Sequence, residues 1–356
     1  MVSLPFKNLE VMLSRRKKVF IQAAVFFLLI LLCIITAEVT LRMLGYSPWK
    51  PYQFDLKVEG RKKFYVKHPV LGYTHLPGEF RMNDPGGRPI LVTHGPDTFR
   101  MTEPLNSTTR KKPGKEIWIF GCSYTYGQGL NDSETYPWLL QKEFPEFKVV
   151  NFGVGGYSTL QSFIQFQEAL KTKSKPAYAI VAYGSFHDER NVFSRSRRKL
   201  VYAGNELGQL AYPYARMDRN GKLNYFLTYV NYVEFPLMRH SALVHLIERA
   251  CNRAEHYFYR SREVSEAILV TFYDLARKND IEFIVAGLDN ESARMLRNLS
   301  LRGISVVDVS VDLKIDENRQ SYNDHHPSAR ANELYAQKLS AFLKDRFLHR
   351  SPVQLS

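Results

Sequence analysis

From Glu116 onward, apolar segments of strand length alternate with amphipathic segments of helix length. The strand-like segments are IWIF (117–120), VVNFG (149–153), YAIVAYG (178–184), IEFIVAG (281–287) and ISVVDVS (304–310). The helix-like segments cover residues 134–144, 159–172, 264–280 and 328–347. Strands that are apolar throughout are buried on both faces, which is typical of a parallel sheet covered by helices. The alternation therefore predicts a three-layer α/β/α domain with a doubly wound, five-stranded parallel sheet of flavodoxin-like type.

Two other segments extend this domain, which we expect to span residues 116–347. Residues 190–262 separate the third and fourth strands and carry a hairpin signal at Asn220-Gly221. We interpret them as an insertion that forms a lid or a substrate-binding region. Residues 46–115 are rich in proline, glycine and aromatic residues, and their turn signals predict a small β-rich segment with a linker into the α/β domain.

The N-terminus contains an uncharged apolar run at residues 19–37. As a helix this run is about 28 Å long, close to the ~30 Å hydrocarbon core of a bilayer. Four basic residues at 15–18 precede it, so we expect residues 1–18 to be cytoplasmic, residues 19–37 to be a transmembrane signal anchor and the rest to be extracytoplasmic. In a Gram-negative bacterium that compartment is the periplasm. A cleaved signal peptide is the alternative, but the run is long for one and no clear A-x-A site follows.

Charge and cysteine content narrow the classes of partner. The net charge of +14 fits a surface that faces an acidic envelope or lipid headgroups, and no nucleic-acid-binding motif accompanies the basic runs. The three cysteines form neither a disulfide framework nor a zinc-ligand spacing. The glycines at 153–156 do not complete a dinucleotide-binding fingerprint. We therefore expect no nucleic acid, no metal and no cofactor.

Four polar segments lie where a doubly wound sheet places its functional edge. They are GCS (121–123), NFGVGGYST (151–159), YGSFHDERN (183–191) and NDHHPSARAN (323–332). A serine becomes a nucleophile when a base takes its proton and a carboxylate orients that base, and Asp324 and His326 can supply both from one loop. The N–H groups of Ser123 and Gly156, with a side chain from the third strand end, are candidate donors to an oxyanion.

These segments resemble known sequence blocks. FGCSYTYG, NFGVGGYST, AYGSFHDERN and DHHPS are similar, in order, to blocks I, II, III and V of the SGNH (GDSL-type) serine hydrolases. The resemblance covers roughly residues 115–190 and 280–347, about half of the chain. It implies that Ser123 is the nucleophile and donates its N–H to the oxyanion, that Gly156 is the second donor and that His326 is the base.

The chain departs from the family pattern in two places. The third block of the family has an Asn before an Asp, whereas the aligned pair here is His187-Asp188, so an imidazole N–H would be the third oxyanion donor. The last block of the family is D-x-x-H, whereas Asp324 and His326 are separated by a single residue, His325, which is the rival base.

The predicted function is that of an exported, membrane-anchored serine esterase that works through an acyl-enzyme. Its expected substrates are ester-linked acyl groups, O-acetyl groups among them, on an envelope glycan or a lipid. The alternatives are an acyltransferase and an SGNH-like domain of impaired activity that binds glycan or a partner. Within the site, Cys122 is the rival nucleophile, His187 has a structural role as its alternative, and Ser123 could instead cap the helix that follows it.

Overall fold

The computed structural model describes residues 6–51, 57–61, 63–84, 86–104, 114–320 and 326–349. The chain forms two compact units. The smaller unit comprises Met1–Pro51 and Val233–Arg253, and the larger comprises Tyr52–Tyr232 and Ala254–Ser356. Part of the expected insertion therefore groups with the N-terminal helix. The segment boundaries inferred from the sequence, at 46–115 and 116–347, stay predictions.

The central sheet of the larger unit has five parallel strands. They are β6 (Glu116–Phe120), β7 (Lys148–Asn151), β8 (Tyr178–Tyr183), β11 (Glu282–Gly287) and β12 (Ser305–Asp308). Their order across the sheet is β12-β11-β8-β6-β7, and every pairing is parallel. Taken in chain order from the β7 edge, this is the 2-1-3-4-5 arrangement of flavodoxin-like sheets. The predicted five-stranded sheet is confirmed.

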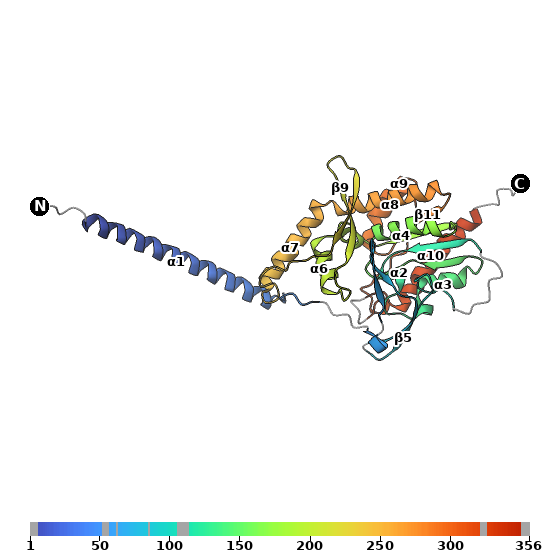
Figure 1. Ribbon diagram of the computed structural model, residues 1–356, viewed down its shortest axis with the longest axis horizontal. Helices are drawn as coiled ribbons and strands as arrows, with labels where there is room; N and C mark the ends of the chain where they lie inside the picture. The colour runs from blue at the N-terminus through green and yellow to red at the C-terminus, as the bar shows by residue number, and fades with distance from the viewer. Residues whose placement is uncertain are drawn as a thin grey trace. The chain divides into compact units, whose positions relative to one another are not determined.

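Helices cover both faces of this sheet (Figure 1). The helices α4 (Thr159–Thr172), α8 (Ser261–Lys278) and α9 (Ala293–Leu301) pack on one face, and α3 (Tyr136–Glu143) and α10 (Ala329–His349) pack on the other. Strand β6 shows why the strands are apolar throughout. Trp118 and Phe120 point into the first core, whereas Ile117 and Ile119 point into the second. The predicted three-layer α/β/α arrangement is confirmed.

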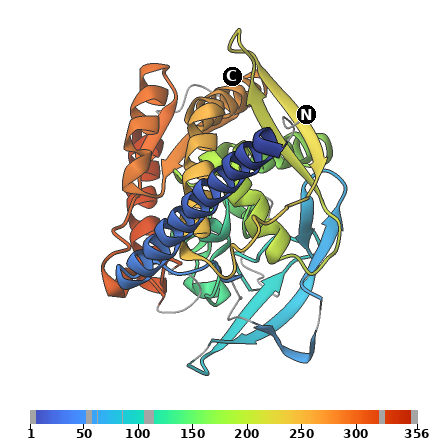
Figure 2. The ribbon, with the colours of Figure 1, turned by 90° about the vertical axis from the view of Figure 1, so that its left-hand side faces the viewer.

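Short antiparallel strands precede the central sheet. They are β1 (Lys57–Val58), β2 (Tyr65–His68), β3 (Gly72–His75), β4 (Gly78–Asn83) and β5 (Pro89–His94), with the 3₁₀ turn η1 (Glu59–Arg61). Strands β1, β4 and β5 form one sheet and β2 and β3 form another, and β4 and β5 are the light-blue and cyan pair in Figure 2. Buried Arg100 joins this region to the turn after Ser123, because its guanidinium donates to the Asp132 carboxylate (2.9 Å) and to the carbonyl oxygen of Leu130 (2.5 Å).

The hairpin expected around Asn220-Gly221 is confirmed. Strand β9 (Ala211–Met217) pairs antiparallel with β10 (Leu223–Tyr229), drawn in yellow in Figure 2. The remaining elements are α2 (Ser123–Tyr126), η2 (Asp132–Glu134), α5 (His187–Asn191), α6 (Arg195–Ala203), α7 (Ala242–Phe258), η3 (Asn290–Ser292) and η4 (Asp316–Asn318).

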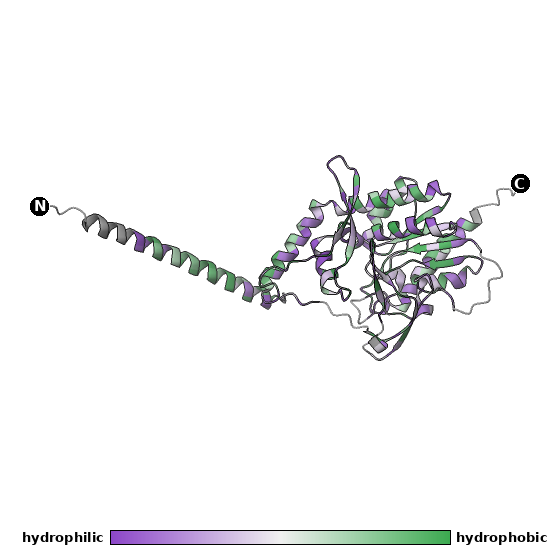
Figure 3. Ribbon diagram, viewed as in Figure 1, coloured by the Kyte–Doolittle hydropathy of each residue, from purple (hydrophilic) through white to green (hydrophobic). Residues whose placement is uncertain are grey.

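The N-terminal helix α1 (Phe6–Met43) is apolar over most of its length (Figure 3). Its segment Arg16–Met43 is long and apolar enough to cross a membrane, and the apolar window within it is exposed all round. Among the described residues, no other helix meets these criteria. A signal sequence near an N-terminus would meet them too.

Candidate active site

Ser123 stands directly after the carboxyl end of β6. It is the first residue of α2, and only 4% of its surface is exposed. The strand-to-helix turn is too tight for a side chain at Gly121, where a Cβ atom would lie 2.1 Å from Thr125 Oγ1. The glycine therefore lets the chain reverse within two residues of the strand and places the serine at the edge of the sheet where doubly wound folds hold their sites.

The serine hydroxyl contacts a histidine from the far end of the chain. His326 Nε2 lies 2.9 Å from Ser123 Oγ, which is the hydrogen-bond distance required between a nucleophile and its base. His326 comes just before α10, and its ring and the Tyr124 ring form a T-shaped pair with 5.6 Å between the centroids. The structure thus brings together two of the residues predicted from the sequence.

Of the three other candidates near these two residues, the structure describes only one. Asp324, the predicted carboxylate, and His325, the rival base, lie outside the described residues. Cys122, the rival nucleophile, is completely buried in the core. Of the adjacent cysteine and serine, it is the serine that contacts an imidazole.

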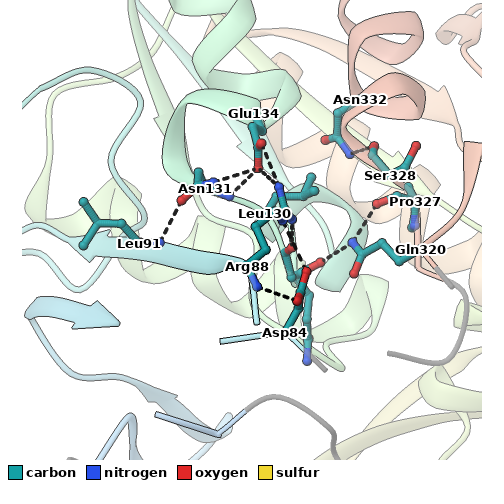
Figure 4. Close-up of polar contacts among 12 residues, drawn as sticks. Asp84, Arg88, Leu91, Leu130, Asn131, Glu134, Gln320, Pro327, Ser328 and Asn332 are labelled. Atoms are coloured by element: carbon teal, nitrogen blue, oxygen red, sulfur yellow. Dashed lines mark hydrogen bonds and ion pairs between the residues drawn. The ribbon is translucent and has the colours of Figure 1, made fainter. Parts of the chain in front are cut away.

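Gln320 ties the loop that carries His326 to the turn that carries Ser123 (Figure 4). Its backbone N–H donates to the carbonyl oxygen of His326 at 2.8 Å. Its side-chain amide donates to the carbonyl oxygens of Pro327 (2.9 Å) and Gln128 (2.8 Å). Because the N–H of Gln128 in turn donates to the carbonyl oxygen of Ser123 at 3.0 Å, these bonds hold the backbone of the histidine against that of the serine.

Figure 4 shows a second set of contacts on the β5 side of this turn. The Asn131 side chain accepts from the N–H of Leu91 in β5 at 2.8 Å. Arg88 donates to the carboxylate of Glu134 at 2.9 Å and to the carbonyl oxygen of Gly129 at 3.1 Å. The turn after Ser123 is therefore held from the β1-β4-β5 sheet as well as from the loop before α10.

The Gly155-Gly156 peptide is the second part of the site to be held by distant side chains. Gly156 has φ of +80°, and a Cβ atom there would lie 2.6 Å from the Tyr73 hydroxyl and 2.8 Å from an Arg197 nitrogen. The Tyr73 hydroxyl donates to Gly155 O at 2.7 Å, and Arg197 donates to Gly156 O at 2.5 Å. Only glycine fits this position.

The N–H groups expected to bind an oxyanion have no acceptor in the part of the chain that the structure describes. Within the described residues, neither the Ser123 N–H nor the Gly156 N–H donates a hydrogen bond. The Gly156 N–H and the Gly155 carbonyl belong to the same peptide group. The hydrogen bond from Tyr73 to that carbonyl therefore both orients the N–H and polarises it toward an incoming anion.

His187, the predicted third donor, is the first residue of α5 and is 1% exposed. Its Nδ1 lies 3.1 Å from the Thr159 hydroxyl, and its Nε2 has no partner among the described residues. Burial lowers the pKa of His187 well below its ordinary value, and the nearby Arg190 and Arg197 lower it further. The ring is therefore neutral. The described contacts include no hydrogen bond between His187 and Ser123.

Three residues of this arrangement were not among the sequence candidates: Tyr73, Arg197 and Gln320. Tyr73 and Arg197 contact the glycine peptide from 82 and 41 residues away in the sequence. No motif marks them, because only the folded chain brings them to that peptide. Gln320 lies three residues before Asn323-Asp324, so its nearness to the expected catalytic loop was the one available signal.

No protein-family model and no curated protein matches this sequence. Several solved structures are similar to it. A member of the lipolytic protein G-D-S-L family from Veillonella parvula DSM 2008 is 13% identical, with 65% of this chain and 100% of that chain covered and a TM-score of 0.38. A GDSL-like lipase from Bacteroides thetaiotaomicron VPI-5482 is 12% identical, with coverages of 65% and 89% and a TM-score of 0.37. The psychrotrophic esterase EstA from Pseudoalteromonas sp. is 11% identical, with coverages of 66% and 99% and a TM-score of 0.38. At such low identities and TM-scores, these likenesses say nothing about activity or substrate.

Proposed function

We propose that this protein is a serine ester hydrolase in which Ser123 is the nucleophile and His326 is the base. One observation carries the proposal: the 2.9 Å contact between Ser123 Oγ and His326 Nε2 at the carboxyl edge of a doubly wound sheet. The resemblance of the surrounding sequence blocks to those of SGNH hydrolases supports the same assignment.

The reaction follows from this pair. His326 takes the Ser123 proton as Oγ bonds to the ester carbonyl carbon, and the carbonyl electron pair moves to its oxygen. The N–H groups of Ser123 and Gly156 bind that oxyanion. When the carbonyl re-forms, the alcohol leaves with the proton from His326 and an acyl-enzyme remains. Water, activated by His326, then releases the acid, whereas an acceptor alcohol would complete a transfer instead. Asp324 is the proposed carboxylate that orients His326.

His187 is the proposed third donor to the oxyanion. If the Thr159 hydroxyl donates to Nδ1, the neutral ring carries its hydrogen on Nε2, the nitrogen that lacks a partner among the described residues. Leaving such a buried donor unpaired is costly, which supports a bound oxyanion as its partner during the reaction. His187→Asn should then keep more of the turnover than His187→Ala.

The proposed setting is the outer side of a bacterial membrane, with α1 as an uncleaved anchor and its basic residues 15–18 on the cytoplasmic side. The proposed substrates are ester-linked acyl groups, O-acetyl groups included, on an envelope glycan or lipid. The exposed apolar surface of α1 and the net charge of +14 support a place beside acidic lipids or polymers.

Substitutions at the site test the assignment through hydrolysis of an aryl acetate. Ser123→Ala and His326→Ala should each lower kcat by several orders of magnitude, because a nucleophile and its base act together and neither works without the other. His325→Ala and Cys122→Ala serve as controls and should keep most of the activity. A Ser123→Ala protein that is folded and still active would refute the nucleophile, and a dominant loss in His325→Ala would move the base to that residue.

A further inference from the structure

A glutamate at the end of α1 caps a helix that lies about two hundred residues later in the sequence. The Glu38 carboxylate accepts hydrogen bonds from the N–H groups of Ala242 and Leu243, both at 2.9 Å, and from the Ser241 hydroxyl at 2.7 Å. Since α7 begins at Ala242, Glu38 satisfies backbone donors of its first turn, the task that an N-cap side chain performs elsewhere.

The chain that follows α1 is fastened to the same place. Arg42 donates to the carbonyl oxygen of His240 at 2.7 Å, and the N–H of Trp49 donates to the carbonyl oxygen of Met238 at 3.1 Å. The guanidinium of Arg239 lies 5.2 Å from the centre of the Trp49 ring. The end of α1 and the segment before α7 therefore form one joint within the smaller unit.

Apolar side chains of this unit are exposed around the joint. Those nearest the end of α1 are Met43 (83% exposed), Leu44 (69%) and Tyr46 (41%). Leu237 (67%) and Val233 (72%) come from the segment before α7. Leu237 also has φ of +65°, a backbone conformation that is costly for a residue with a side chain.

The length of the apolar run in α1 sets the level at which these residues would lie relative to a bilayer. If α1 crosses a bilayer, its last turn reaches the headgroup region, and a group that hydrogen-bonds to Glu38 lies at the same level. Tyrosine, tryptophan and arginine, which occur here as Tyr46, Trp49 and Arg239, are the residues favoured at that level.

We propose that residues 233–245 bind the surface of the bilayer that α1 crosses, with Leu237 inserted among the lipid headgroups and Glu38 as the joint that holds them there. This inference rests on the membrane-anchored part of the proposed function. In residues 38–51 and 233–253 the unit carries five arginines or lysines and three glutamates, so its net charge is positive. A bilayer surface that contains anionic lipid has the opposite charge and is the expected partner.

A fluorescent label at position 237 tests the proposal in the full-length protein. The protein is reconstituted in vesicles of phosphatidylcholine and phosphatidylglycerol, with Cys33 and Cys251 replaced by serine and Leu237→Cys carrying an environment-sensitive dye. The buried Cys122 stays, and protein without the Leu237 change measures its background. Leu301→Cys, at a leucine of the larger unit that is even more exposed (83% against 67%), is the matched control. Native Cys33, labelled in a Cys251→Ser protein, reports on α1.

We expect lipid-borne nitroxides to quench the label at 237 several-fold more than the label at 301. Glu38→Ala should bring the label at 237 to the level of 301 while the helix content by circular dichroism stays the same, and Glu38→Gln, which keeps an acceptor, should be intermediate. Quenching at Cys33 without quenching at 237 would refute the proposal and leave the anchor intact. Absence of quenching at Cys33 would refute the anchor and the proposal together.

Discussion

Tyr73 holds the peptide whose other end is the proposed oxyanion donor. Its hydroxyl donates to Gly155 O at 2.7 Å, and the N–H of the same peptide belongs to Gly156. Removing an oxyanion donor outright costs roughly 100-fold to 1,000-fold in turnover, so loss of the bond that orients one should cost less.

We therefore expect Tyr73→Phe to lower kcat about tenfold on an aryl acetate and to leave KM nearly unchanged, since the donor acts mainly on the transition state. Tyr65→Phe is the matched control, because Tyr65 lies on the same hairpin and its hydroxyl makes no hydrogen bond among the described residues. An equal loss in both variants, or a change confined to KM, would show that Tyr73 only packs against the loop.

At the scale of residues, the sequence indicated candidates whose side-chain type the reaction itself would require. It did not indicate the residues that only position the backbone of the site. Ser123 and His326 could be proposed because a nucleophile and a base need particular residue types and because the surrounding blocks resemble those of SGNH hydrolases. The structure places the two side chains in contact, and their roles stay a prediction. Tyr73 and Gln320 act through one hydroxyl and one amide on distant carbonyl groups, and many residues offer such donors. Nothing in a linear pattern distinguishes them.

At the scale of elements, two buried histidines join the small sheets that precede the central one: His75 lies in β3 of the β2-β3 sheet and His94 in β5 of the β1-β4-β5 sheet. His75 (1% exposed) and His94 (2%) stack with their ring centroids 4.4 Å apart. Burial lowers the pKa of His94 to about 4, and burial, together with the nearby His94 and Arg100, lowers the pKa of His75 well below its ordinary value. Both rings are therefore neutral in the folded protein near pH 7.

Because both rings are buried in the neutral form, we expect the free energy of unfolding to fall as the pH falls. Between the ordinary histidine pKa near 6.5 and pH 4, the unfolded chain binds protons that the folded chain does not, which favours unfolding by about 1.4 kcal/mol per pH unit for each histidine. His75→Phe should keep the ring packing and reduce this slope, measured as the change in the free energy of urea unfolding between pH 7 and pH 5 in detergent. Other buried histidines, such as His187, contribute equally to both proteins. Identical pH dependence with and without the substitution would contradict the account.

The elements also differ in how well the sequence revealed them. The five strands of the α/β layers and the helices α3, α4, α8 and α10 were predicted, because strands buried on both faces are apolar throughout and helices buried on one face are amphipathic, as in β6 and α4. The helix α9 was not predicted. The position of the small antiparallel sheets could not be predicted, because it depends on Arg100. The Arg100 guanidinium donates hydrogen bonds to carbonyl oxygens in and after α2. A lone arginine in a sequence gives no indication that it will be buried.

At the scale of the whole molecule, we propose that everything after Glu38 lies outside the cytoplasm. Protease added to spheroplasts should then digest residues 38–356, whereas a cytoplasmic control protein should survive. The chain should sediment with membranes and should resist extraction by salt, because α1 is held by apolar surface and not by charge. A protected domain would contradict the orientation, and a shortened form in the soluble fraction would indicate cleavage.

The division into two units could not be predicted from the sequence. Residues 233–253 group with residues 1–51 through the contacts of Glu38, Arg42 and Trp49. A carboxylate at the end of an apolar helix is ordinary in a sequence, and its partner lies about two hundred residues away. Nothing in the sequence therefore indicated that the first turn of α7 is capped from α1.

The central claim is that Ser123 is a nucleophile activated by His326, and covalent labelling tests it most directly. Full-length protein is treated with a fluorophosphonate, which reacts with activated serines whatever their natural substrate, and the modified peptide is located by mass spectrometry. We expect one adduct, on Ser123, that is lost in Ser123→Ala and in His326→Ala and is retained in Tyr65→Phe. A folded protein that takes up no label, or carries it on another residue, would contradict the account.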